Sequence, residues 1–224
     1  MKEHRNISIA DQIFEQLETE ILSGKYHRGD ILNELRLSRE MEVSRTPIRE
    51  ALLRLGQENM VRESGRGMVV VGITREDMLD MYDVRLHLEG EIARRTAVNI
   101  QQEQLAKLLE ILELQRFYIS RQGGESSAHI RDLDSQFHEL VYQSCGSKTY
   151  TFILTRIHKR MMKFRKASVS NQKRALQSIE EHMEIYHALA AHDPEAAEKA
   201  ALAHVRNAMR RLELMEPEPL GEEL

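Results

Sequence analysis

Residues 43–52 read VSRTPIREAL, and this stretch decides the fold of the N-terminal part of the chain. Ser44 can cap a helix, and Pro47 suits its first turn, where the missing backbone N–H is not needed. The apolar residues that follow recur at the three-and-four spacing of one buried helical stripe. They are Ile48, Ala51, Leu52 and Leu55. The stretch therefore predicts an amphipathic helix that begins near Ser44.

The polar face of this helix carries Arg45, Thr46 and Arg49. Two arginines one turn apart present planar forks that match phosphates or guanine edges, so this face is a candidate DNA reader. A helix with outward arginines is usually only a solvated face, and the assignment therefore depends on the neighbouring elements.

The neighbouring elements are helical on one side and β-rich on the other. Upstream, the apolar residues of 9–22 form a helical stripe that is closed by a glycine, and a short second helix is expected at about 34–42. Downstream, two β-rich pieces at 60–63 and 68–71 flank the turn SGRG. They predict a β-hairpin, or wing, with Arg66 at its tip.

This order of three helices and a wing resembles the winged helix-turn-helix of the GntR family of bacterial transcription regulators. The segments ILSGKYHRGDIL, VSRTPIREALLRLGQENMV and GRG carry the resemblance, which covers about the first 70 residues. It implies that Arg45, Thr46 and Arg49 contact DNA and that Gly67, in the wing, approaches the minor groove. Arg66, beside Gly67, is a further candidate DNA contact.

Two positions depart from the family pattern. Leu35 stands where many members have a DNA-contacting arginine, and Arg36 is displaced by one position, or about a hundred degrees around the helix. We keep Arg36 as a candidate DNA contact. Glu42 stands where a turn glycine is usual, and a left-handed backbone there would cost roughly 1 kcal/mol for a residue with a Cβ.

Composition sets outer bounds on the fold and the compartment. The 224 residues are 41% hydrophobic and 30% charged, with four prolines and no tryptophan, which favours a folded and mostly helical protein. No segment has the length of a membrane span or the form of a signal peptide, so we expect a cytoplasmic protein without membrane contact. The net charge of -4 means that any DNA contact must come from a local face. The single Cys145 excludes an internal disulfide and is expected to be a packed residue.

From Thr74 onward the sequence predicts helices alone. Breaks at Asn99, Gly123-Gly124, Gly146, Ser170-Asn171 and Asp193-Pro194 separate six segments. The segments are 75–98, 101–121, 126–144, 147–168, 172–192 and 194–215. The expected fold class is mainly α: a winged helix-turn-helix with a small β-hairpin over 1–73, an antiparallel bundle of about six helices over 74–215, and an acidic tail over 216–224.

Four side chains in this bundle form a candidate metal site. Asp134 and His138 are spaced i, i+4 and project from one helical face. His182 and His204 lie on the last two helices, and the turn at Asp193-Pro194 lies midway between them, so an antiparallel hairpin brings them level. Among ten histidines one such pair arises readily by chance, and most histidines lie on the surface or in a satisfied core.

A second resemblance supports this site. The segments DLDSQFHELVYQSCGS, EEHMEIYHAL and HDPEAAEKAALAHV look like the FCD domain, the ligand-binding domain of the FadR branch of the GntR family. The resemblance implies that Asp134, His138, His182 and His204 hold a divalent metal. Zinc is favoured, although nickel and manganese fit the same ligands.

The charge of such a site suggests its ligand. Three neutral imidazoles, one carboxylate and a dication sum to +1, and four protein ligands leave two positions of an octahedral shell open. A small organic carboxylate fits both conditions. Arg85 matches the arginine with which such domains often engage an acidic effector, while a role as a surface charge or as a partner of Glu89 is equally compatible with the sequence.

These features favour a transcription regulator over an enzyme. The expected protein is a homodimer, a repressor rather than an activator, that binds a pseudo-palindromic operator in double-stranded DNA and responds to a small carboxylate. The alternative is a metal-dependent hydrolase or isomerase that uses the same three histidines and aspartate to activate water. A helical interaction protein with a vestigial site is a third reading.

Overall fold

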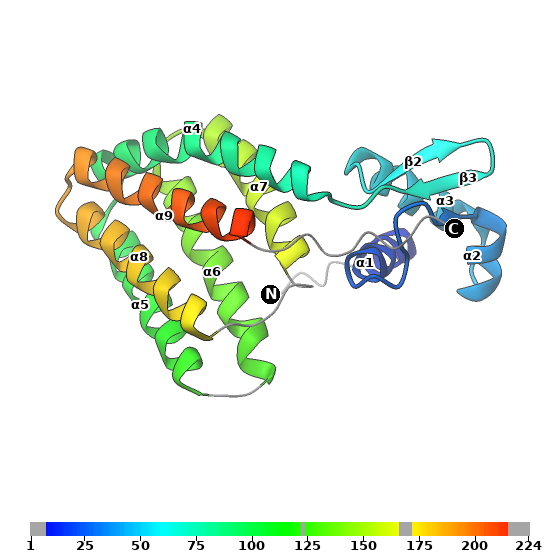
Figure 1. Ribbon diagram of the computed structural model, residues 1–224, viewed down its shortest axis with the longest axis horizontal. Coiled ribbons are helices and arrows are strands. Elements are labelled where there is room, and N and C mark those ends of the chain that lie inside the picture. The colour runs from blue at the N-terminus through cyan, green and yellow to red at the C-terminus, as the bar shows by residue number, and fades with distance from the viewer. Residues whose placement is uncertain (1–7, 122–123, 166–171, 215–224) are drawn as a thin grey trace, which may run out of the picture. The chain divides into compact units, whose positions relative to one another are not determined.

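A computed structural model describes residues 8–121, 124–165 and 172–214. The chain divides into two compact units between Thr74 and Arg75. Figure 1 labels their helices and the strands β2 and β3. The acidic tail over 216–224 and the predicted break at Ser170-Asn171 lie outside the described residues, as does Gly123.

Over its described residues, 8–74, the first unit contains three helices and three short strands. The helices are α1 (Ile9–Leu22), α2 (Glu34–Glu40) and α3 (Arg45–Gln57), and the strands are β1 (Ile31–Leu32), β2 (Val61–Ser64) and β3 (Gly67–Val70). The predicted apolar stripe of α3 is buried against α1 and α2, because Ile48, Ala51 and Leu55 are all fully enclosed. Ser44 occupies the N-cap position of α3, but its side chain makes no capping hydrogen bond, which corrects the sequence-based expectation.

The turns of this unit use left-handed backbone at two sites that the sequence marks. Gly24, just after α1, has φ of +79°, as expected of a helix-ending glycine. Glu42, between α2 and α3, has φ of +55° although it carries a Cβ. The left-handed turn of the family is therefore retained here without its glycine, at a cost of roughly 1 kcal/mol.

The wing is part of a three-stranded antiparallel sheet in the order β1-β3-β2, whereas the sequence predicted only the hairpin of β2 and β3. Strand β1 pairs Ile31 with Val69 and Leu32 with Met68. Gly67 has φ of +134°, and a Cβ built on it would lie 2.9 Å from the carbonyl oxygen of Leu32. Glycine is thus required at this position by the close approach of β1.

The second unit is a bundle of helices, and the predicted fold class is confirmed. Its helices begin and end within two residues of the predicted segments, apart from the predicted end at 168, which lies outside the described residues. They are α4 (Arg75–Asn99), α5 (Gln102–Ser120), α6 (Gly124–Ser144), α7 (Lys148–Arg165), α8 (Gln172–Ala190) and α9 (Pro194–Leu214). In Figure 1 the long α4 runs alongside α9, with which it makes its most extensive packing contact.

The helices of the bundle pack closely around an apolar core. A Cβ on Gly90 of α4 would lie 3.1 Å from Cγ of Leu202, so a glycine lets α4 approach α9. Cys145 is buried in the core, as expected of a packed residue. Within the described ranges, none of the helices combines the length and the apolar character needed to cross a membrane.

Candidate functional site

The outer face of α3 presents the side chains that the sequence selected as DNA readers. Arg45 and Arg49 are 57% and 58% exposed, and Thr46 between them is also exposed. All three lie in the first turn and a half of α3, where the helix N-terminus adds partial positive charge. The face is accessible and locally basic.

A carboxylate from the neighbouring helix holds both arginines. Glu34, the first residue of α2, accepts hydrogen bonds from Nη2 of Arg45 at 2.8 Å and from Nε and Nη2 of Arg49 at 2.9 Å each. The Arg49 and Arg45 guanidinium groups hold the pKa of Glu34 at about 2, well below its ordinary value of 4.5. Glu34 therefore stays ionised and orients the two arginines relative to one another.

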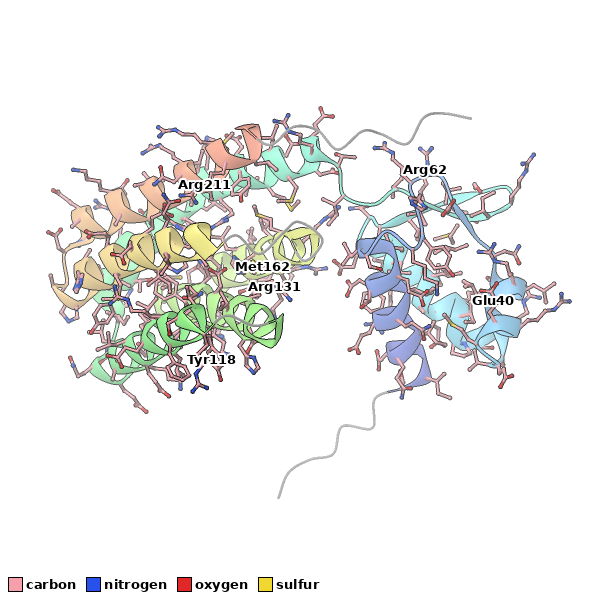
Figure 2. All side chains as sticks on the ribbon, turned by 60° about the horizontal axis from the view of Figure 1, so that its bottom comes forward. Glu40, Arg62, Tyr118, Arg131, Met162 and Arg211 are labelled. Carbon is pink, nitrogen blue, oxygen red and sulfur yellow. The ribbon has the colours of Figure 1, made fainter. Side chains whose placement is uncertain are left out.

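The remaining predicted DNA contacts lie on α2 and in the wing. Arg36 is exposed and pairs with Glu40 at the end of α2, Nε to Oε1 3.4 Å (Glu40 is labelled in Figure 2). Leu35, the departure from the family pattern, is 47% exposed. Arg66 is exposed in the turn between β2 and β3, directly before Gly67.

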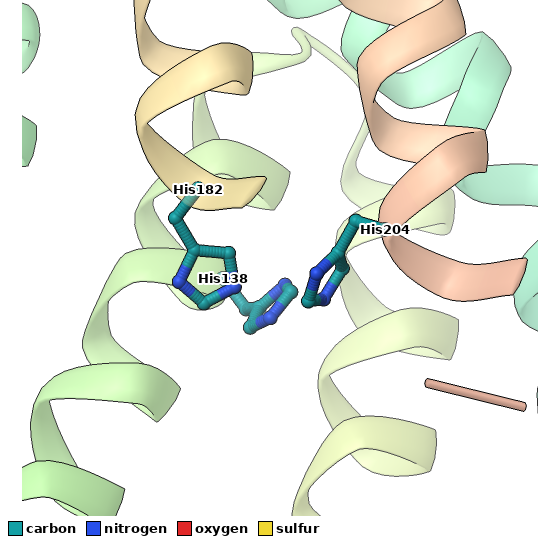
Figure 3. A group of neighbouring side chains, drawn as sticks. All are labelled: His138, His182 and His204. Carbon is teal, nitrogen blue, oxygen red and sulfur yellow. The ribbon is translucent and has the colours of Figure 1, made fainter. Parts of the chain in front are cut away.

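The predicted histidines of the second unit come together in the bundle core. His138 of α6, His182 of α8 and His204 of α9 converge in Figure 3, and one nitrogen of each lies within 4.8 Å of the other two. All three residues are buried, with at most 4% of their surface exposed. The hairpin of α8 and α9 places the rings of His182 and His204 4.6 Å apart, centroid to centroid.

The fourth predicted ligand lies beside this group. Oδ1 of Asp134 is 4.0 Å from Nε2 of His182, and its side chain is 13% exposed. Ligand atoms bonded to one metal ion at about 2.1 Å are at most about 4.2 Å apart. The separation of 4.0 Å between Asp134 and His182 fits two ligands of one ion. The three imidazole nitrogens, which lie within 4.8 Å of one another, need only small side-chain shifts to close on it. This set of nitrogen and oxygen donors suits zinc, nickel or manganese.

A buried polar chain connects Arg85 to the histidines. Nε of Arg85 donates to Oε1 of Glu89 at 2.5 Å, and the Tyr142 hydroxyl donates to the same oxygen at 2.7 Å. The Tyr142 oxygen lies 3.4 Å from Nδ1 of His138. Since the Tyr142 hydroxyl donates its hydrogen bond to Glu89, its oxygen can accept a hydrogen bond from Nδ1–H of His138. The lone pair of His138 is then on Nε2, where it could bind a metal.

Burial and charge set the protonation of these groups. Burial lowers the pKa of His138 well below 6.5, and the neighbouring His158 and His182 lower it further. Burial alone would lower the pKa of the Arg85 guanidinium, but Glu89 outweighs this effect and raises it. Burial, followed by the Glu89 charge, raises the pKa of Tyr142 well above 10. The site thus contains a neutral His138, a cationic Arg85 and a protonated Tyr142.

Two family models match the chain. The model of bacterial regulatory proteins of the gntR family matches residues 9–70, and the model of the FCD domain matches residues 80–207. The chain belongs to the GntR family. The two matched regions correspond to the winged helix-turn-helix unit and to the helical bundle.

Individual relatives of this GntR-family protein include named repressors. The gluconate operon transcriptional repressor of Bacillus subtilis is 32% identical over 156 residues, which are 65% of this chain and 64% of that repressor. The repressor of the same name from Bacillus licheniformis is 35% identical over 58% of this chain. The alignments span only 52% and 64% of the length of these two repressors. The repressor RspR of Escherichia coli is 26% identical over 88% of this chain and 86% of its own.

Solved structures agree with the fold. Escherichia coli McbR/YncC superimposes with a TM-score of 0.69 at 21% identity, over 92% of this chain and 98% of that one. The Listeria monocytogenes regulator Lar gives the same TM-score at 17% identity, over 93% of this chain and 98% of its own. At these identities the likeness extends to the fold alone.

Sequence reasoning missed a fourth buried imidazole of this GntR-family protein. His158, on α7, is 5% exposed, and its ring centroid lies 4.4 Å from that of His138. Its Nε2 is 3.9 Å from Oδ2 of Asp134, so the aspartate lies between His158 and His182. The available signal was its spacing: His158 occupies the buried helical stripe between Leu154 and Met161.

Proposed function

We propose that this GntR-family protein is a DNA-binding transcriptional repressor whose operator affinity is controlled by a small organic carboxylate. The effector binds at a divalent metal held by Asp134, His138, His182 and His204. The observation that carries the proposal is the convergence of three buried imidazoles from three helices beside one carboxylate.

The first unit supplies the DNA contacts in this proposal. Arg45, Thr46 and Arg49 of α3 read the major groove, and the wing with Arg66 and Gly67 approaches the minor groove. Two copies of the chain place two recognition helices in neighbouring major grooves of a pseudo-palindromic operator. A net charge of -4 makes the local basic face and the pairing of two copies necessary for useful affinity.

The second unit supplies the effector site. A bound zinc, nickel or manganese ion would add a double positive charge and open coordination positions for carboxylate oxygens. Arg85 adds a second anchor, because Nη2 of this buried guanidinium has no hydrogen-bond partner among the described residues. A buried donor without a partner is costly, and an anionic ligand between the ion and Arg85 would satisfy it.

Repression follows from the named relatives. The gluconate operon proteins and RspR are named transcriptional repressors, and we extend that role to this chain. The effector would change the DNA affinity by a coupling free energy of roughly 1–3 kcal/mol, which corresponds to about 5–150-fold.

The proposal is tested by separating its two halves. Selection from a random duplex library with the full-length protein should return a pseudo-palindromic sequence. Arg49→Ala should then lose binding to this sequence and keep its bound metal, whereas Lys107→Ala, which removes an exposed cation of α5, should change neither. Retention of full operator affinity by Arg49→Ala would overturn the proposed DNA face. Catalytic turnover by the metal-loaded protein would support the hydrolase or isomerase alternative.

A further inference from the structure

Glu181, on α8 next to His182, gathers the side chains of one face of α9. Its carboxylate accepts from Nδ1 of His204 at 2.9 Å, from Nδ2 of Asn207 at 3.1 Å and from Nη2 of Arg211 at 3.0 Å. The side chain is 16% exposed. Since residues 204, 207 and 211 lie on one face of α9, this single carboxylate ties that face to α8.

The contact with His204 decides how this imidazole can bind a metal. A histidine ligand commonly donates its second N–H to a carboxylate, which fixes the ring orientation and makes the other nitrogen more basic. Glu181 occupies that position, because its Oε2 accepts a hydrogen bond from Nδ1–H of His204, which puts the lone pair of this imidazole on Nε2. We propose that Glu181 is a positioning residue that presents His204 to the metal and transmits metal occupancy to the last turn of α9. This inference rests on the metal site proposed above.

The last turn of α9 also contacts the first residue of α4, where the bundle begins. Nη2 of Arg75 donates to the carbonyl oxygen of Leu212 at 3.3 Å, and Leu212 directly follows Arg211 (Arg211 is labelled in Figure 2). Arg75 is the first residue of α4, immediately after Thr74, where the winged helix-turn-helix unit ends. Arg211, which is bound by the Glu181 carboxylate, and Leu212, whose carbonyl binds Arg75, are thus adjacent residues of α9.

This arrangement gives the metal site a route to the DNA-binding unit. When His204 closes on an ion, its partner Glu181 moves or becomes more rigid. Because Glu181 holds Arg211, the backbone at the adjacent Leu212 changes with it. The connection at Arg75 is then ordered differently with and without the ion. If this hydrogen-bond network couples the two ends, the backbone around each of its members should become more ordered when metal binds. Amide hydrogen exchange measures this change.

Glu181→Gln tests both roles, with Glu180→Gln as a matched control. Glu180 is the preceding residue, carries the same charge and is 67% exposed in a surface pair with Arg116. Zinc affinity is measured on the full-length protein by competition with a chelating indicator. Glu181→Gln should weaken zinc binding about 10–100-fold, as loss of an outer partner usually does, and Glu180→Gln should change it less than about twofold. Equal zinc affinity in Glu181→Gln and wild type would overturn the positioning role.

The coupling role is measured by hydrogen–deuterium exchange at saturating zinc, so that the difference in affinity does not matter. In the wild type, zinc should slow amide exchange around His138 and also in the first turn of α4 and the last turn of α9. In Glu181→Gln the slowing around His138 should remain and that at Arg75 should be lost. Arg211→Met, which leaves the contact of Glu181 with His204 intact, should retain zinc affinity and lose the same protection at Arg75. Slowing at Arg75 in both variants as in the wild type would overturn the coupling role, whereas a wild type that binds no zinc, nickel or manganese would overturn the metal site itself.

Discussion

Glu34 and Arg49 form a two-point ion pair between the first residue of α2 and the recognition face of α3, with both N–O distances at 2.9 Å. The same carboxylate holds Arg45 at 2.8 Å. The two proposed readers of DNA are therefore fixed relative to one another and partly neutralised before any DNA is bound. DNA phosphates must compete with Glu34 for these guanidinium groups. The operator bases gain affinity from the fixed orientation, because the arginines need not be ordered on binding.

Glu34→Gln should consequently bind DNA more strongly but less selectively. The substitution removes the charge that competes with phosphates, so the affinity for a random 25-base-pair duplex should rise and its dependence on log salt should steepen by about one to two units. The ratio of operator to random-duplex affinity should fall. Fluorescence anisotropy over a salt series measures both quantities. Glu110→Gln, which removes the same charge from an exposed pair on α5 of the bundle, is the matched control, and an unchanged salt slope in Glu34→Gln would contradict the competition.

The same cluster predicts an abnormal acid titration. The pKa of Glu34 is about 2 rather than 4.5 because Arg49 and Arg45 stabilise the carboxylate. A depressed folded-state pKa stabilises the fold above pH 4.5, and this contribution is lost as the pH falls from 4.5 towards 2. Carbon-detected NMR of the Glu34 carboxyl should show the low pKa in the wild type and a higher one in Arg49→Ala, where Arg45 alone still lowers the pKa below 4.5. An ordinary pKa in the wild type would mean that the ion pair does not persist in solution.

The four buried histidines should contribute unequally to metal binding. His204 belongs to the close group of three nitrogens, while His158 contacts Asp134 from the other side. His204→Ala should lower zinc affinity by more than about a hundredfold, which exceeds the usual effect of losing a residue that only hydrogen-bonds to a ligand. His158→Ala should lower it by less than about tenfold. Competition with a chelating indicator measures both. A larger loss in His158→Ala than in His204→Ala would show that the ion lies between Asp134 and His158.

His138 predicts how the metal-free protein responds to acid. Burial, and after it the neighbouring His158 and His182, lower the pKa of His138 well below 6.5. In the unfolded chain this imidazole takes up a proton near pH 6.5, whereas in the folded chain it stays neutral. The contribution of His138 to the free energy of unfolding should therefore be constant above pH 6.5 and fall as the pH drops below it. Thermal melting in chelator from pH 8 to 5.5 measures this loss, which should be smaller in His138→Gln. A melting temperature independent of pH over this range would contradict a neutral buried His138.

Much of this fold could be predicted from the sequence because its elements are locally determined. Helix boundaries follow from signals that need no distant partner, such as Gly24 after α1 and Asp193-Pro194 before α9. Strand β1 was missed because its two residues have no periodicity of their own and exist as a strand only through pairing with β3. Ser44 was placed correctly at the N-cap of α3, but its side-chain hydrogen bond is not made, because residue type shows only that such a bond can form.

The candidate site was predictable only in part, for a related reason. Asp134 and His138 are related by helical spacing, and His182 and His204 by the symmetry of a hairpin, so sequence distance was sufficient to place them together. Hairpin symmetry also brings His158 level with Asp134 about Gly146, and Glu181 level with His204 about Asp193-Pro194. It does not show which faces of two paired helices meet, and for this reason neither contact was predicted. Arg85 was selected as a candidate from the sequence, but its burial with an unsatisfied Nη2 could be seen only in the packed core.

Arg85→Lys tests whether that guanidinium receives the effector carboxylate. Lysine keeps the positive charge beside Glu89, which matters because removing one partner of a buried ion pair costs roughly 3–5 kcal/mol. Lysine has no counterpart of Nη2 of Arg85, so a charge-assisted hydrogen bond of about 1.5–3 kcal/mol to a carboxylate should be lost. A thermal-shift panel of small mono- and dicarboxylates with zinc should show a melting-temperature increase in the wild type that chelator abolishes. In Arg85→Lys the required carboxylate concentration should be about 10–100-fold higher at unchanged zinc affinity, while Arg94→Lys, on the exposed side of α4, should match the wild type. The same response in Arg85→Lys as in the wild type would show that the carboxylate is held by the metal without Arg85.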